Sequence, residues 1–149
     1  MNSIKVKIKI LREGTAAPQY ATEGAAAIDL RSGADTPITI APGERVLIPT
    51  GIAIAPESSD VVAILAARSG LSVKHGITVT NGIGVIDSDY RGEICVSLCN
   101  VSDTAYTVTP GERIAQLMFM PVLHADLIPT DTLDETDRGT GGFGSTGKH

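Results

Sequence analysis

The chain has 149 residues, of which 42% are hydrophobic and 19% charged, and its net charge is −5 at pH 7. This size supports one hydrophobic core rather than two, and this composition excludes an intrinsically disordered chain. The acidic balance excludes the basic surface that binding to polymeric DNA or RNA requires, so any phosphate compound bound here should be small.

The hydrophobic pattern also argues against a membrane location. The longest apolar run, residues 61–67, is far shorter than the roughly 20 residues that span a bilayer. The N-terminal residues alternate lysine with isoleucine and valine and show no apolar segment ahead of a cleavage site, as a secretory signal would. We therefore expect a cytoplasmic protein that does not contact membranes.

Short β-rich runs separated by turns follow one another along the chain. Residues 4–10 (IKVKIKI) alternate strictly, which predicts a strand with one buried isoleucine face and one solvated lysine face. The later runs read PITI, RVLIPTGIAIA, VVAIL, ITVTNGIGVI, EICVSL, YTVTP and ERIAQLMFM. No run keeps a helical period over ten residues, and the nearest helix candidate is the segment 70–75. The pattern predicts an all-β fold.

One short motif occurs twice, as PGER at residues 42–45 and again at residues 110–113. Proline followed by glycine suits a type II turn, in which the glycine takes a positive φ, and each turn should begin a core strand. Two such turns in corresponding positions favour a double-sheet jelly roll. The copies differ three residues further on, where Gln116 replaces the alkane side chain of Ile48. This amide inside a structural repeat marks a candidate functional residue.

The two cysteines, Cys95 and Cys99, lie four residues apart in an extended segment. That spacing separates their Cα atoms by roughly 13 Å, whereas a disulfide needs less than about 7 Å. The three histidines do not complete a zinc site with them. We therefore expect two free thiols that serve in packing.

The C-terminal segment differs from the rest. Residues 124–137 are acidic, and residues 138–149 read RGTGGFGSTGKH, in which only Phe143 can bury much area. Such a segment cannot order by itself, because the entropy cost of about 1–2 kcal/mol per residue exceeds what one aromatic ring returns. The sequence predicts one β domain over residues 1–137 and a flexible arm over 138–149 that closes over a phosphate and a base. The alternative is an ordinary mobile terminus.

Three other active-site patterns fail on context. Glycines of the tail match G-x-G-x-x-G and nearly match a P-loop, but both motifs need a preceding core strand and a following helix. A serine hydrolase built on Ser69, His75 and Asp87 lacks the G-x-S-x-G elbow.

Two segments concentrate polar chemistry. Arg68, Ser69 and Gly70 directly follow the apolar run, which offers a guanidinium, a hydroxyl and an unhindered backbone N–H to phosphate oxygens. The alternative is a turn with a solvated arginine. Residues 81–92 (NGIGVIDSDYRG) predict a hairpin whose glycines let a ligand ring lie against the main chain. There Asp87, if partly buried, suits a general base, whereas Asp89 suits a turn cap. The alternative is an ordinary hairpin with carboxylates at its turn.

The chain resembles the trimeric dUTP pyrophosphatase family along nearly its whole length. Five motifs in family order carry the resemblance: residues 26–30 (AAIDL), 68–71 (RSGL) continuing to 74–76 (KHG), 81–92, 111–117 (GERIAQL) and 138–145 (RGTGGFGS). The resemblance implies a jelly-roll subunit, a homotrimer with shared active sites, and a C-terminal arm that closes each site. It also implies magnesium-dependent hydrolysis of dUTP to dUMP and pyrophosphate, which keeps uracil out of DNA and supplies dUMP for dTMP synthesis.

The resemblance assigns catalysis to Asp87, which would orient and deprotonate the attacking water, and to Gln116, which would hold that water or the α-phosphate. It implies that Asp29 reaches Mg²⁺ through water. The remaining residues would bind substrate: Arg68, Ser69 and Gly70 the phosphates; Asn81, Gly84, Val85 and Ile86 the uracil; Tyr90 the deoxyribose; and Arg138, Phe143, Gly144, Ser145 and Thr146 from the arm, with Phe143 stacking on the base. The chain departs from the family pattern at Ala27, usually glycine, and at Ala67, usually proline.

Two rival functions remain open on the sequence. A dCTP deaminase-like enzyme would act on cytosine, although the complete arm argues against it. A catalytically silent binding module would keep the scaffold alone, although Asp87, Gln116 and Phe143 are all present. Turnover of dUTP discriminates among the three.

Overall fold

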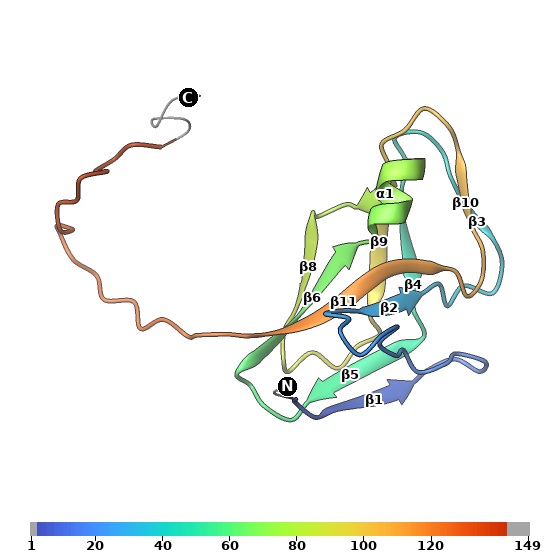
Figure 1. The fold of residues 1–149 in the computed structure, drawn as a ribbon, viewed down its shortest axis with the longest axis horizontal. Coiled ribbons are helices and arrows are strands. Elements are labelled where there is room, and N and C mark those ends of the chain that lie inside the picture. Colours follow the sequence, from blue (N-terminus) through green and yellow to red (C-terminus); the bar gives the residue numbers. More distant parts are fainter. Residues whose placement is uncertain (1–2, 143–149) are drawn as a thin grey trace.

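The computed structural model describes residues 3–142, which form a nearly all-β body and a long C-terminal arm (Figure 1). The elements are β1 (Val6–Ile10), β2 (Ile28–Arg31), β3 (Ile38–Ile40), β4 (Arg45–Pro49), β5 (Ile52–Pro56), β6 (Val61–Ala67), α1 (Ser69–His75), β7 (Ile77–Val79), β8 (Ile83–Ile86), β9 (Cys95–Asn100), β10 (Tyr106–Val108) and β11 (Arg113–Pro121). The short helix α1 lies at the nearest helix candidate predicted from the sequence, residues 70–75. Among the described residues, no helix has the length and apolar character needed to cross a bilayer.

The strands form four antiparallel sheets. The two larger sheets have the strand orders β2-β11-β6-β8 and β4-β9-β7, and the pairs β1-β5 and β10-β3 complete the body. Neighbours that are distant in sequence, such as β2 and β11, require crossover connections, as in Greek-key and jelly-roll proteins. The predicted all-β jelly-roll class is confirmed.

The hydrophobic core lies between the two larger sheets. Leu30, Leu65 and Leu117 enter it from the four-stranded sheet, and each is at most 4% exposed. Val96 and Leu98 enter it from β9, where buried and half-buried positions alternate. This alternation follows from the two-residue period of a strand, which turns successive side chains toward opposite faces of the sheet.

Both copies of the PGER motif form the expected turns. Gly43 has a φ of 75° and Gly111 a φ of 76°, and the turns precede β4 and β11. In both copies the glutamate carboxylate accepts the backbone N–H of the residue three positions earlier, at 2.8 Å for Glu44 and 2.9 Å for Glu112. The repeat is therefore a turn that begins a strand in both copies. Beyond the turn the copies differ, because Gln116 is half-buried whereas its counterpart in β4, Ile48, belongs to the core.

The N-terminal strand departs from expectation on one point. β1 is present, but Ile8 is 40% exposed and Ile10 is 41% exposed, so its isoleucine face is not buried as predicted. The physical reason is that β1 pairs only with β5 in a two-stranded sheet. One edge and one apolar face of β1 are thus left uncovered by residues 3–142.

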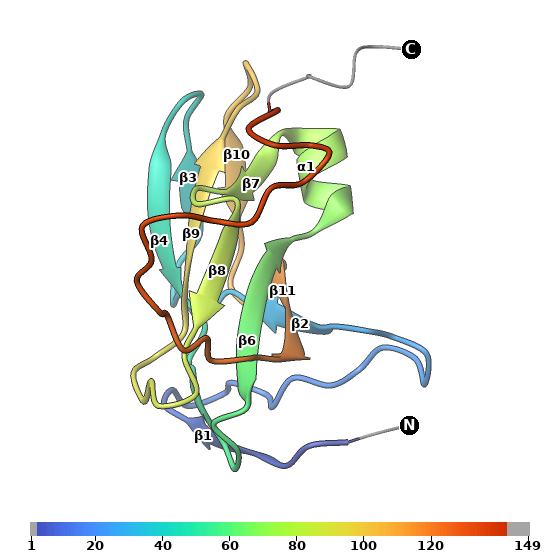
Figure 2. The same cartoon turned by 90° about the vertical axis from the view of Figure 1, so that its left-hand side faces the viewer.

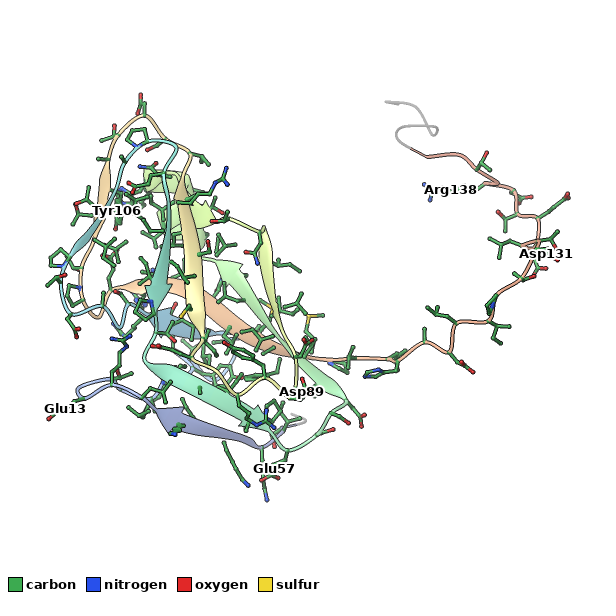
Figure 3. All side chains as sticks on the ribbon, turned by 180° about the vertical axis from the view of Figure 1, so that it is seen from behind. Glu13, Glu57, Asp89, Tyr106, Asp131 and Arg138 are labelled. Carbon is green, nitrogen blue, oxygen red and sulfur yellow. The ribbon has the colours of Figure 1, made fainter. Side chains whose placement is uncertain are left out.

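The arm begins earlier than residue 138, because the chain leaves the body at the end of β11. Val122 still donates its N–H to the carbonyl of Asp60 at 2.9 Å, after which residues 123–142 extend away from the sheets (Figures 1 and 3). Four large apolar side chains of the arm are at least 80% exposed: Leu123, Leu127, Ile128 and Leu133. Closure over a ligand by residues 138–149 stays a prediction.

Candidate functional site

A group of charged and polar side chains gathers where three neighbouring strands meet. We call Asp29 of β2, Arg68 directly after β6, and Arg113 and Gln116 of β11 the charged cluster. The strand register makes this grouping, since Gln116 pairs with Asp29 on one side and with Ala66 on the other. Sequence analysis predicted Asp29, Arg68 and Gln116 as site residues and did not include Arg113.

The members of the charged cluster bind one another. Arg68 donates from Nε to Asp29 Oδ1 at 2.8 Å, and Arg113 donates from Nη1 to Asp29 Oδ2 at 3.1 Å. Gln116 donates from Nε2 to the carbonyl of Ala67 at 2.9 Å, which ties β11 to the end of β6. Two guanidinium groups share one carboxylate, so the cluster keeps a surplus positive charge that suits a phosphate group.

Ser69 and Gly70 extend the charged cluster into the first turn of α1, where both residues are exposed. A Cβ atom placed on Gly70 would meet no atom within 4 Å, so packing within the chain does not require glycine there. The open space instead lets a ligand approach the backbone closely. The serine hydrolase alternative finds no support, because the ring of His75 packs on Tyr106 with centroids 4.8 Å apart.

A second group lines a cavity of about 270 Å³ beside β8, which we call the hairpin pocket after the hairpin predicted for residues 81–92. That prediction is wrong, because β8 pairs with β6, and among the described residues it does not pair with the strand that follows it. The lining residues of the pocket are Leu65, Asn81, Gly84, Val85, Ile86, Asp87, Tyr90, Ile94, Cys95 and Ser97. The cavity thus brings together all six residues that the sequence predicted between positions 81 and 90. The others come from β6, from β9 and from the residue before β9, and no local motif marked them.

The floor of the hairpin pocket depends on one missing side chain. Gly84 pairs with Leu65 across β8 and β6, and a Cβ atom on Gly84 would lie 3.1 Å from the Leu65 Cβ. Glycine therefore keeps the space above Leu65 open. The cavity is slightly smaller than the roughly 300–1,000 Å³ of drug-sized sites, which suits a single base and sugar better than a polymer.

The two carboxylates in the segment after β8 occupy different places. Asp87 lines the hairpin pocket, whereas Asp89 does not and projects at the surface of the body (Figure 3). Asp87 is exposed in this chain, so the partial burial expected of a general base is not provided by residues 3–142. The backbone carbonyl of Asp87 accepts the Tyr90 N–H at 3.1 Å, and this bond closes the turn between Asp87 and Tyr90.

The charged cluster and Asp87 lie at opposite ends of β6. Figure 2 shows β8 running antiparallel beside β6, with α1 following the far end of β6. Ile86 pairs with Ala63, so Asp87 lies near Val62, six residues before Arg68. At about 3.3 Å per residue, this places Asp87 roughly 20 Å from Arg68 along the strand.

As far as Gly142, the arm does not join these two groups within one chain. Arg138 is exposed, donates from Nε to the carbonyl of Gly141 at 2.9 Å, and lies far from the body (Figure 3). Phe143, Gly144, Ser145 and Thr146 lie outside the described residues.

A larger hollow of about 780 Å³ lies between the loop that follows β1 and the turn before β11. Of the predicted site residues it contains only Asp29. Volume alone is therefore a poor guide in this molecule, and the smaller hairpin pocket is the better candidate.

Two titratable groups near the hairpin pocket have shifted pKa values. Burial raises the pKa of the Cys95 thiol, so this side chain stays protonated and is a weak nucleophile at neutral pH. The hydrogen bond from Arg12 lowers the pKa of Glu93, which keeps that carboxylate charged. Cys95 is therefore a packing residue of the pocket wall, as the sequence predicted, and both cysteines are free.

The fold and these two groups define a jelly-roll protein with a small-ligand pocket beside strand β8. The family model for dUTPase matches residues 13–147. The deoxyuridine 5'-triphosphate nucleotidohydrolase of Desulfitobacterium hafniense (strain DSM 10664 / DCB-2) is 53% identical over 149 residues, which cover 99% of each chain.

Solved structures agree with this fold. The dUTPase of Staphylococcus bacteriophage 80alpha with dUPNHPP matches with a TM-score of 0.87 at 24% identity, covering 96% of this chain and 98% of the other. The dUTPase of phage phi11 of S. aureus, described with a structural Mg(II) ion, matches with a TM-score of 0.79 at 20% identity, covering 88% and 99%. The chain belongs to the dUTPase family.

Proposed function

We infer that this chain hydrolyses dUTP to dUMP and pyrophosphate. The observation that carries the inference is the hairpin pocket, because it unites five predicted substrate-binding residues and the predicted catalytic Asp87 in a chain that is 53% identical over its full length to a deoxyuridine 5'-triphosphate nucleotidohydrolase. The reaction removes dUTP before a polymerase can place uracil in DNA, and it supplies dUMP for dTMP synthesis.

We propose that the hairpin pocket holds the nucleoside part of the substrate. The backbone of Gly84, Val85 and Ile86 and the side chain of Asn81 offer donors and acceptors to the uracil edge. Tyr90 provides a flat wall for the deoxyribose and leaves no space for a 2′-hydroxyl. The lining of these residues around one cavity supports the assignment.

We propose that the charged cluster holds the triphosphate. Arg68 would exchange its bond to Asp29 for phosphate oxygens, while the Ser69 hydroxyl and the Gly70 N–H add donors. Arg138, Gly144, Ser145 and Thr146 would close over the phosphates from the arm, and Phe143 would stack on the base. Charge develops on phosphate oxygens during in-line attack, so these donors should supply most of the acceleration.

Asp87 would orient and deprotonate the water that attacks the α-phosphorus, and Gln116 would help to hold that water or the α-phosphate. A general base of this kind contributes about 10²–10⁴-fold. Because Asp87 is exposed in the single chain, a neighbouring protein surface is needed to exclude bulk water from it.

The residues present fit Mg²⁺ only through water. Both carboxylate oxygens of Asp29 accept bonds from arginines, and no cluster of three or more His, Cys, Asp or Glu side chains occurs among residues 3–142. Mg²⁺ keeps several waters and is commonly held by substrate phosphates with one or two carboxylates. When bound with dUTP, the ion would neutralise charge on the phosphates, and Asp29 would hold one of its waters.

We propose that three copies of the chain form a trimer in which the sites are shared. The roughly 20 Å between Asp87 and Arg68 exceeds the reach of one α-phosphate. The sheet face opposite the core also carries an apolar row, in which the half-buried Met118 and Ile64 and the exposed Val85 pair across β11, β6 and β8. A second chain that packs on this face would bring its own Asp87 toward a neighbour's charged cluster.

Pyrophosphate release measured with Mg²⁺ across dUTP, dTTP, dCTP and UTP tests the proposal. We expect rapid release from dUTP and little from the other three nucleotides. Ammonia release from dCTP would instead support the deaminase-like alternative, and binding of dUTP without release would support the silent module.

A further inference from the structure

Tyr90 is held by the two residues that follow Arg91. Its side chain is 47% exposed and lines the hairpin pocket, whereas Gly92 and Glu93 are not part of the pocket lining. Residues that fix the position of the Tyr90 ring therefore influence the shape of the pocket without lining it.

Gly92 leaves space that the ring of Tyr90 occupies. A Cβ atom placed on Gly92 would lie 2.6 Å from Cζ and 3.0 Å from Cε2 of Tyr90, and closer still to the hydroxyl oxygen. The backbone of Gly92 is outside the positive-φ region, so other residues can adopt its conformation. A Cβ atom at this position is therefore incompatible with the present place of the Tyr90 ring, whereas the backbone conformation itself would accept another residue.

Glu93 fixes the far end of the same ring. The Tyr90 hydroxyl donates to the carbonyl oxygen of Glu93 at 3.1 Å. The Glu93 carboxylate Oε1 in turn accepts Arg12 Nε at 3.0 Å and the Gly51 N–H at 2.8 Å. The acceptor for the tyrosine hydroxyl is thus anchored to the turn between β4 and β5 and to the segment after β1.

We propose that Gly92 and Glu93 are positioning residues that hold the Tyr90 ring as a rigid wall of the hairpin pocket and thereby set the selection of deoxyribose over ribose. The inference rests on the proposed function, in which Tyr90 faces the sugar. A wall excludes one hydroxyl only when it cannot move aside. The Gly92 backbone lies against one side of the Tyr90 ring, and the Glu93 carbonyl holds its hydroxyl end, so both restrict movement of the ring.

This role predicts a particular kinetic signature. The ring contacts the sugar both before and during the reaction, so a displaced ring weakens ground state and transition state alike. Such a change raises KM while kcat changes little. UTP needs the space that the displaced ring vacates. The kcat/KM for UTP should therefore fall less than that for dUTP, or rise.

The test compares Gly92→Ala with Gly24→Ala, a matched control at an exposed glycine whose added Cβ would meet no atom within 4 Å and whose φ is also not positive. We expect Gly92→Ala to reduce the dUTP-to-UTP ratio of kcat/KM by about tenfold, mainly through the KM for dUTP, since a tenfold change corresponds to about 1.4 kcal/mol. Gly24→Ala should match the wild type. A wild-type ratio in folded Gly92→Ala overturns the inference.

A double variant separates positioning from a general loss of structure. In a Tyr90→Ala background, Gly92→Ala should change the ratio less than about twofold, because no ring remains to displace. The same loss in both backgrounds overturns the inference. Should Gly92→Ala fail to fold, Tyr90→Phe replaces it, because this variant keeps the ring and removes the hydroxyl that donates to Glu93; an unchanged ratio there also overturns the inference.

Crystal structures of the unliganded wild type and of Gly92→Ala keep this test independent of the proposed function. We expect the Tyr90 ring to lie in a different place in the variant. If the wild type does not hydrolyse dUTP, the proposed function fails, and an unmoved ring would then overturn the positioning role on its own. If the wild type hydrolyses dUTP and the ring does not move, only the positioning role fails.

Discussion

The hairpin pocket and the charged cluster are built in opposite ways. The hairpin pocket is shaped by apolar strand residues and by Gly84, and it is already open in the single chain without a ligand. In the charged cluster, Arg68 and Arg113 already share the carboxylate of Asp29. The pocket is therefore ready to receive a base and sugar, whereas the cluster must exchange bonds when a phosphate group binds. Recognition of the nucleoside should be rigid, and recognition of the phosphates adaptable.

The two regions also lie at opposite ends of β6, so one chain alone cannot bring both of them to the same substrate molecule. Each chain carries both halves of the proposed site but holds them roughly 20 Å apart along the strand. The activity should depend on assembly, and the fold of one body should not.

Of the variants that distinguish the hairpin pocket from the charged cluster, Asp87→Asn should have the largest effect on activity. We expect kcat to fall by about 10²–10⁴-fold while binding of dUTP is retained, because the amide keeps the shape of the hairpin pocket and cannot accept the proton from water. Asp89→Asn, two residues away and outside the pocket lining, is the matched control and should keep wild-type turnover. Steady-state pyrophosphate release and calorimetric binding of dUTP measure both. Wild-type kcat in Asp87→Asn contradicts the assignment.

A chain that ends at Asp137 should show the next largest effect. It should fold and assemble normally, because the body ends with β11 and the arm makes few contacts with it. It should hydrolyse dUTP about 10²-fold more slowly, since the donors and the aromatic ring that close over the substrate are gone. Turnover equal to that of the full chain would contradict the lid role of residues 138–149.

A smaller effect should follow from Asp29→Asn, which breaks the charged cluster. Two arginines lose their shared carboxylate, so we expect KM to rise by about tenfold as they become disordered or repel each other. The free energy of unfolding should change by about 1 kcal/mol or less, because these ion pairs are partly exposed. Asp35→Asn serves as a control at an exposed acid outside the charged cluster. A loss of stability much larger than this, with unchanged KM, would mean that the cluster serves the fold.

The smallest effect should be a pH dependence from Glu93. Arg12 lowers the pKa of this carboxyl in the folded protein, so its contribution to stability is present above the unfolded pKa of about 4.3 and is lost as pH falls through the folded pKa. Glu93→Gln should therefore show a weaker loss of stability on acidification below pH 4.3 than the wild type. Denaturant unfolding at a series of pH values measures the difference, and parallel curves would contradict it.

The sequence predicted a region well when the residues of that region lie close together along the chain. The hairpin pocket was largely predictable, because six of its lining residues fall within one run from Asn81 to Tyr90. Its remaining wall was not, since Cys95 and Ser97 come from β9 and carry no motif of their own.

The charged cluster shows the limit more clearly. Arg113 and Asp29 are 84 residues apart in sequence, and only the register of β11 against β2 makes them partners. The exposed isoleucine face of β1 has a similar cause, because alternation predicts a two-faced strand but not what covers its apolar face. In the sequence Gly92 was only the last residue of the predicted hairpin over residues 81–92, and its closeness to the Tyr90 ring alone points to a role.

The shared site is tested most directly by mixing two inactive variants, Asp87→Asn and Arg68→Ala. Each homotrimer should be nearly inactive, because one lacks the base and the other a phosphate ligand. If each site combines Asp87 of one chain with Arg68 of another, mixed trimers refolded from equal amounts should regain about a quarter of the wild-type sites. Activity that stays at the level of the separate variants, in trimers shown to contain both chains, would contradict the account.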